Sequence, residues 1–175
     1  MDTLVGVGAH QTVRELATKG RAAKSARYLG PHLHWDYRTS VERKLRIQAA
    51  RRAWMDYKSF WYKAVDLSAK TILYRAVVFS TLVSALSAFV LTEADYRELE
   101  GFHHRNLRAL LRGRASTITE SGTVAKSNAE VRKMASLPSV ATALRVMRLR
   151  WLQQGLRTPH HNAQLLAAWH GVFGV

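Results

Sequence analysis

Cysteine is absent from this 175-residue chain, and its absence removes several classes of function. The chain can form no disulfide framework, offers no thiolate nucleophile and cannot build the zinc fingers or knuckles that need cysteine ligands. The N-terminal residues 1–16 also lack the basic start, apolar run and small-residue cleavage site of a secretory signal. The favoured expectation is therefore an intracellular location, in the nucleus or the cytoplasm.

The common catalytic motifs are also missing. The sequence has no Gly-rich phosphate loop, no GxSxG nucleophile elbow and no HExxH helix. A two-metal phosphoryl-transfer site needs clustered carboxylates, but the five aspartates are far apart in the sequence. They are Asp2, Asp36, Asp56, Asp66 and Asp95. We therefore expect no enzyme activity, no catalytic residue and no cofactor for this chain alone.

Three histidine pairs stand out as candidate metal ligands: His32/His34, His103/His104 and His160/His161. Adjacent residues on a helix point about 100° apart. No cysteine or carboxylate completes a ligand set for any of the pairs. We therefore expect surface or snorkelling histidines and no metal site.

Acidic residues are few. The chain has 12 Asp and Glu but 27 Lys and Arg, which gives a formal net charge of +15. The charge is spread along the chain, with +9 on residues 1–88 and +6 on the remainder. Such a surplus is typical of a surface that meets nucleic acid or an anionic membrane. At 47% hydrophobic residues, the chain can still bury the core of one folded domain.

Periodicity predicts a long amphipathic helix that begins near Thr39, with Ser40 as a cap. Apolar residues recur at three- and four-residue steps over about six turns: Ile47, Ala50, Trp54, Tyr57, Trp61 and Val65. The densest basic stretch, residues 38–58, lies mostly off this stripe. We expect the aromatic side chains to make core contacts rather than to stack on bases.

A second helix is predicted from about Leu67 to Val90, capped by Asp66 or Ser68. No charged residue occurs from Ala76 to Leu91. A membrane span needs about 20 apolar residues, and extending this stretch would bring Arg75 into the bilayer. We therefore expect a buried core helix, with a small membrane protein spanning at 76–91 as the alternative.

The remaining chain predicts four more helical segments. A capping box of Thr92 and Asp95 begins a third helix that ends at Gly113 and buries Leu99, Phe102, Leu107, Leu110 and Leu111. Residues 114–127 are predicted to form a loop. A short helix at Asn128–Ala135 follows, and a longer one runs from Pro138 to about Leu156 with Val140, Leu144, Met147 and Trp151 on one face. A last short helix at Ala163–His170 is also expected.

Together these patterns predict a mainly α protein, a helical bundle with a short N-terminal β segment. The β segment is one or two short strands around the turn Gly30-Pro31. We expect a loosely structured leader at residues 1–25, a helical domain at 26–159 and a C-terminal tail at 160–175.

The order of short motifs resembles one protein family. The motifs are Tyr28-Leu-Gly30, the Arg-rich helix with Trp54 and Trp61, Leu73-Tyr-Arg-Ala-Val-Val-Phe-Ser80, Leu91-Thr-Glu-Ala-Asp95, Leu99-Glu-Gly-Phe102, Leu107-Arg-Ala-Leu-Leu111, Arg148-Leu-Arg-Trp-Leu152 and Leu156-Arg-Thr-Pro159. They resemble the thumb and connector that follow the catalytic palm in reverse transcriptases of non-LTR (LINE-type) retrotransposons. The likeness covers residues 26–159.

The resemblance implies a thumb-like fragment of an RNA-directed DNA polymerase, without the Asp-Asp motif of the palm. Such a thumb grips RNA or DNA by its backbone without reading sequence, and a palm domain would be its missing partner. Charge clustering places the candidate contacts on three helices: Arg43, Lys44, Arg46, Arg51, Arg52, Arg105, Arg108, Arg112, Arg148 and Arg150. A translated relic without molecular function is a further alternative.

Overall fold

The computed structural model describes residues 25–27, 32–34 and 39–157, and the chain divides into two units, residues 1–38 and 39–175. In the first unit, β1 (Ser25–Arg27) pairs antiparallel with β2 (His32–His34), with Ala26 opposite Leu33. The predicted short N-terminal strands are thus confirmed. The leader up to residue 24 and the C-terminal segment from residue 158, with its expected helix at Ala163–His170, lie outside the described residues.

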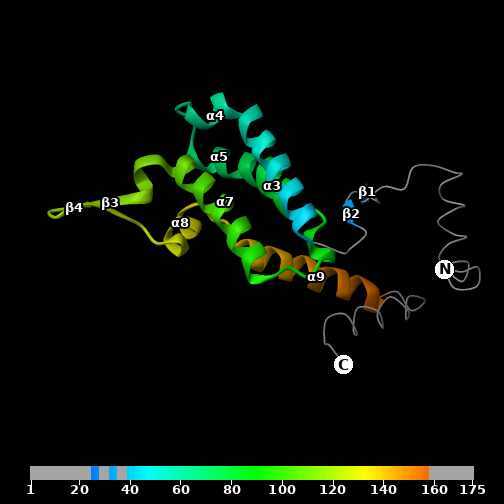
Figure 1. Ribbon diagram of the computed structural model, residues 1–175. Helices are drawn as coiled ribbons and strands as arrows, with labels where there is room; N and C mark the ends of the chain where they lie inside the picture. The colour runs from blue at the N-terminus through cyan, green and yellow to red at the C-terminus, as the bar shows by residue number, and fades with distance from the viewer. Residues whose placement is uncertain (1–24, 28–31, 35–38, 158–175) are drawn as a thin grey trace, which may run out of the picture. The chain divides into compact units, whose positions relative to one another are not determined.

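The second unit is mainly helical, as predicted (Figure 1). Its elements are α3 (Thr39–Asp56), α4 (Lys58–Tyr62), α5 (Leu67–Leu73), the π-helix η1 (Tyr74–Phe79), α6 (Ser80–Val83), the 3₁₀-helix η2 (Leu86–Ala88), α7 (Glu93–Leu111), the 3₁₀-helix η3 (Arg112–Ala115), β3 (Ser116–Thr119), β4 (Gly122–Ala125), α8 (Asn128–Met134) and α9 (Val140–Arg157). The helix α7 packs against α3, α5, α8 and α9, so its buried side chains connect the whole unit.

The first long helix is interrupted at Tyr57, where the sequence predicts a continuous helix. The break lets Trp61 fold back, so that its Nε1 donates to the Trp54 carbonyl at 2.8 Å and the two rings stack with centroids 4.8 Å apart. Both tryptophans are buried, which confirms their core role, whereas Tyr57 is 40% exposed. Stacking of two large rings is worth about 1 kcal/mol beyond the area they bury, so it helps to stabilise the interruption.

The helix that contains the long uncharged stretch runs from Leu67 to Val83 and includes a π-helical turn. In an unbroken α-helix, Phe79, Leu82 and Val83 would be centred about 130° around the helix from Lys70, Thr71 and Tyr74, because each residue advances about 100°. The wider π turn adds one residue and brings both sets onto one face. All six are buried, while Ile72 remains 69% exposed on the opposite face. The helix is therefore buried along one side rather than all round.

This helix ends at Val83, seven residues before the predicted end at Val90. Asp66 caps its start as predicted, accepting a hydrogen bond from the Ser68 amide. At the other end, Ala85 has φ 63° and ψ −16°, a left-handed conformation that costs an L-residue about 1–2 kcal/mol. The chain then turns through η2 toward α7. The early end reflects a backbone reversal that hydropathy alone does not reveal.

We expect Ala85→Gly to raise the free energy of unfolding by about 0.5 kcal/mol. Glycine adopts positive φ without a penalty, and this gain exceeds its larger loss of entropy on folding. Ala88→Gly, in the neighbouring 3₁₀ turn, is the matched control and should destabilise. Urea unfolding followed by circular dichroism measures both. Equal destabilisation by the two variants would contradict the strained backbone at Ala85.

The helix α7 follows the prediction closely at its start and along its core face. Thr92 and Asp95 form the expected capping box, and the five predicted core residues of this helix are all buried. Its end differs, because α7 stops at Leu111 and the positive φ of 53° falls on Arg112 rather than on Gly113. The backbone thus turns one residue earlier than the glycine predicts.

Residues 116–125 form a β-hairpin, where the sequence predicts only a loop. Ser116 lies opposite Ala125 and Thr119 opposite Gly122, so Glu120 and Ser121 make the turn. The two runs of β-branched residues, Thr117-Ile118-Thr119 and Thr123-Val124, were the available signal, and the Ser, Thr and Gly content of the segment hid it. The helix α8 that follows agrees with the prediction and begins with a capping box of Ser127 and Glu130.

The predicted apolar face of α9 is buried only in its first half. Val140 and Leu144 are fully buried, but Met147 is 37% and Trp151 53% exposed. The stripe has the predicted spacing, yet beyond Leu144 the described part of the chain covers it only partly.

Candidate nucleic-acid interface

The five predicted cations of α3 fall into two groups. Lys44, Arg51 and Arg52 are exposed on one face of the helix, together with Gln48 and Met55. At 100° per residue these five positions lie within about a third of the helix circumference. The other two predicted cations, Arg43 and Arg46, take part in intramolecular ion pairs. The α3 segment therefore offers three outward-facing cations in place of the predicted five.

Arg43 is a structural residue that joins α3 to α7. Its guanidinium contacts a carboxylate oxygen of Asp95, and its other terminal nitrogen lies 3.2 Å from Glu98 Oε1. Burial acts to raise the pKa of the Asp95 carboxyl, but hydrogen bonds from Thr92 and the charge of Arg43 together hold it below its ordinary value of 3.8. The pair is nearly inaccessible to solvent, so Arg43 is poorly placed to contact a phosphate.

At the end of α7, two of the three predicted arginines are held by neutral groups. The Nη2 of Arg108 donates to the Lys126 carbonyl and to Asn128 Oδ1, each at 2.8 Å. Arg112 donates to the Tyr62 carbonyl, and its guanidinium lies 5.4 Å from the centroid of the Tyr62 ring. Arg105 is exposed. Because these acceptors carry no charge, the guanidinium groups are fixed in place without being neutralised.

The two predicted cations of α9 differ in role. Arg148 donates to the carbonyls of Ser87 and Phe89, at 3.1 and 2.7 Å, and so ties α9 to the turn that follows α6. Arg150 is exposed, as is Arg145, which the sequence reading did not single out. Sequence clustering thus identified basic segments, but it could not separate structural arginines from free ones.

Most acidic residues of the helical unit are used by the fold itself. Six of the nine acids in residues 39–157 pair with a basic side chain or cap a helix: Glu42, Asp66, Asp95, Glu98, Glu100 and Glu130. Meanwhile, twelve exposed basic side chains have no hydrogen bond or ion pair within residues 39–157. They are Lys44, Arg51, Arg52, Lys58, Lys63, Arg97, Arg105, Arg114, Lys133, Arg145, Arg150 and Arg157. The fold therefore leaves its surface strongly positive.

The central histidine pair is buried, and the expectation of surface histidines is wrong for it. His103 Nδ1 lies 3.0 Å from the Tyr74 hydroxyl and Nε2 lies 3.2 Å from the Pro138 carbonyl. His104 Nε2 lies 2.7 Å from an Arg132 nitrogen and 3.8 Å from Glu100 Oε2. No cluster of metal-ligating side chains occurs in the part of the chain that the structure describes. His160 and His161 lie outside that part.

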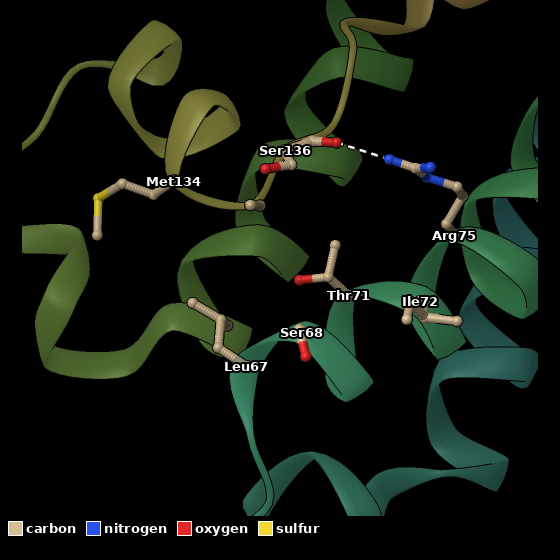
Figure 2. A pocket seen from close by; sticks show the side chains of 8 residues that line it. Leu67, Ser68, Thr71, Ile72, Arg75, Met134 and Ser136 are labelled. Atoms are coloured by element: carbon tan, nitrogen blue, oxygen red, sulfur yellow. Dashed lines mark hydrogen bonds between the residues drawn. The ribbon is translucent and has the colours of Figure 1, made fainter.

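A shallow pocket of about 310 Å³ lies beside α5, where the segment after α8 passes (Figure 2). Leu67, Thr71 and Ile72 line one side, and Met134 and Ser136 lie on the other. Its one ionisable lining residue, Arg75, donates to the Ser136 carbonyl at 2.7 Å. With no carboxylate or histidine in its lining, this pocket offers no general acid or base that titrates near neutral pH.

Comparisons with protein-family models, with curated proteins and with solved structures found no match for this chain.

Proposed function

We propose that this chain binds RNA or DNA through the sugar–phosphate backbone, without reading sequence, in the manner of a reverse-transcriptase thumb. The observation that carries the proposal is that the fold engages most acidic side chains but leaves many basic ones unpaired. Six of the nine acids in residues 39–157 form ion pairs or helix caps, while three cations without a partner share the outward face of α3. A surface with excess Lys and Arg gains affinity for polyanions by releasing condensed counterions. The likeness to the non-LTR family adds support from motif order.

The proposal predicts that binding falls steeply with salt. For a fluorescein-labelled 20-base-pair DNA, log K should decrease linearly with log salt, with a slope of about −0.9 for each phosphate contacted. Replacing Lys44, Arg51 and Arg52 by Gln should make the slope less negative by about 2 to 3 and weaken binding by roughly tenfold or more. All three side chains are exposed, so the fold should persist. Fluorescence anisotropy at several salt concentrations measures both quantities.

The matched control removes three cations elsewhere: Lys58→Gln, Arg97→Gln and Arg157→Gln, from three different helices. Both triple variants lose the same net charge, so a difference between them reports local contact and not the overall field. If both triple variants change the slope equally, the claim that the α3 cations contact the nucleic acid is contradicted. Binding that is insensitive to salt, or absent at low salt, would contradict the proposed function.

The second candidate function is a small membrane protein. One helical stretch of the described chain, Leu67–Ala88, is long and apolar enough to span a membrane, with mean hydropathy 1.5 over its most apolar window. Against it, Lys70 and Arg75 lie in the same stretch and the helix ends at Val83, which leaves 17 residues in regular helix. Flotation with lipid vesicles separates the two candidates, because a spanning protein stays with the vesicles at high salt and alkaline pH.

A further inference from the structure

The hairpin β3–β4 projects from the end of α7, away from the helices of its unit (Figure 1). Seven of its eight strand residues are exposed, and only Ser116 is half-buried. Two apolar side chains are open to solvent, with Ile118 87% and Val124 54% exposed. A two-stranded hairpin has little stability by itself in water, so this element gains from contact with a partner.

The base of the hairpin is surrounded by fixed positive charge. Arg108 donates to the Lys126 carbonyl, and the Lys126 Nζ donates to the Arg114 carbonyl at 2.9 Å. Arg112 is held by the Tyr62 carbonyl, while the Arg114 side chain is exposed and free. From residue 101 to residue 129 the only acid is Glu120, in the turn at the far end. Hydrogen bonds from Ser127 lower the pKa of the Glu130 carboxyl, just after this stretch, and Lys126 is close enough for its ammonium to help lower it. Arg108 and Arg112 are held by neutral acceptors, so these two cations are preorganised for an anionic partner.

The composition of the hairpin favours a double strand over a single strand. Single-strand binders stack bases on aromatic side chains, and residues 116–125 contain none. They are instead rich in Ser and Thr, whose hydroxyls hydrogen-bond to phosphate and sugar oxygens. Slender side chains on a two-stranded ribbon also suit the width of a groove.

We propose that the β3–β4 hairpin enters a groove of double-stranded nucleic acid, while Arg108, Arg112, Arg114 and Lys126 at its base contact the flanking phosphates. Four residues of strand extend about 13 Å. The major groove of B-form DNA is about 12 Å wide and 8.5 Å deep and admits a two-stranded ribbon. In an A-form duplex the wide, shallow minor groove takes this role. The inference rests on the proposed function and assigns it a duplex-contacting element.

The test compares two exposed apolar residues at opposite ends of α7. Ile118→Asp places a negative charge on the hairpin, and Val90→Asp places the same charge before the helix begins, at a residue 79% exposed. We expect Ile118→Asp to weaken binding to a 20-base-pair DNA or RNA–DNA duplex by about tenfold, and Val90→Asp by less than about twofold, since one lost groove contact is of that size. Circular dichroism and thermal melting confirm that both variants are folded.

A second variant keeps every cation and removes the hairpin by joining Ser116 to Ala125 through Asn-Gly. It also deletes Glu120, so the overall charge becomes more positive and electrostatics alone predict tighter binding. We expect duplex affinity to fall about tenfold instead, with single-strand affinity unchanged within about twofold. Glu120→Gln in the full hairpin should strengthen duplex binding, because it removes a charge that repels phosphate.

Three outcomes would overturn the inference. If Ile118→Asp and Val90→Asp weaken duplex binding equally, or the hairpin deletion leaves duplex affinity unchanged, backbone binding stands and the hairpin has no part in it. If sedimentation shows that the hairpin instead drives self-association through its open strand edges, the partner is a second copy of the chain. If the wild-type chain binds no nucleic acid at low salt, the proposed function fails as well.

Discussion

Asp95→Asn is expected to lower the free energy of unfolding by about 3 kcal/mol, because it leaves the Arg43 guanidinium buried without its main counterion. The side chains of Arg43 and Asp95 are 9% and 4% exposed, and Asp95 also contacts Thr39 and Thr92. Asparagine retains a side-chain oxygen for the capping box, so the loss reports the charge rather than the cap. Urea unfolding at neutral pH measures the change.

Two controls separate this ion pair from general effects on charge. Glu98→Gln removes the other carboxylate near Arg43, but that group is 53% exposed, so we expect a loss below about 1 kcal/mol. Adding Arg43→Met to Asp95→Asn removes the stranded cation and should restore at least about 1 kcal/mol of the loss. If the double variant is no more stable than Asp95→Asn alone, the destabilisation does not come from the unpaired arginine.

Features encoded by neighbouring residues could be predicted from the sequence. The capping box of Thr92 and Asp95, the Asp66 cap and the buried face of α7 each depend on spacing over a few residues, and the structure confirms them. The interruption at Tyr57 and the hairpin could not be predicted in this way. The first is stabilised by the stacking of Trp54 on Trp61, and the second has a loop-like composition.

The candidate interface was only partly predictable, because exposure depends on partners far away in the sequence. Arg43 and Lys44 are adjacent, yet Arg43 pairs with an acid 52 residues away and Lys44 faces solvent. The cations at the hairpin base that sequence reading passed over, Arg114 and Lys126, lie in the segment expected to be a loop. Clustering of charge in the sequence identifies basic segments, but tertiary structure determines which of their side chains remain exposed and unpaired.

We expect the protein to lose about 2 to 3 kcal/mol of stability between pH 7 and pH 4.5 through His103 alone. Burial lowers the pKa of His103 to about 4 from its ordinary 6.5, and the neighbouring His104 acts in the same direction. The Pro138 carbonyl can only accept, so Nε2 carries the proton and Nδ1 accepts from the Tyr74 hydroxyl. The neutral ring is thus fully bonded, and a second proton would have no acceptor other than the Tyr74 oxygen.

The direction of this change in stability follows from whether the folded or the unfolded state binds the proton at the higher pH. Below pH 6.5 the unfolded chain protonates His103, while the folded chain does so only near pH 4. Stability is therefore complete above pH 6.5 and falls as the pH approaches 4. The carboxyl of Asp95 has a lowered pKa and loses its contribution only at lower pH, below its ordinary 3.8. His104, whose pKa is also lowered chiefly by burial, acts in the same direction as the pH falls below 6.5.

The control is the double variant Tyr74→Phe/His103→Leu, which removes the titrating ring together with the hydroxyl that depends on it. This variant should be less stable at pH 7, because the Pro138 carbonyl loses its donor. Its stability should nevertheless change by about 2 to 3 kcal/mol less than that of the wild type between pH 7 and pH 4.5. An unchanged pH dependence would assign the effect to His104 or to other groups. A ¹⁵N spectrum of the wild type that shows the Nδ1–H tautomer of His103 would contradict the hydrogen bonds to Tyr74 and Pro138 that hold the neutral ring.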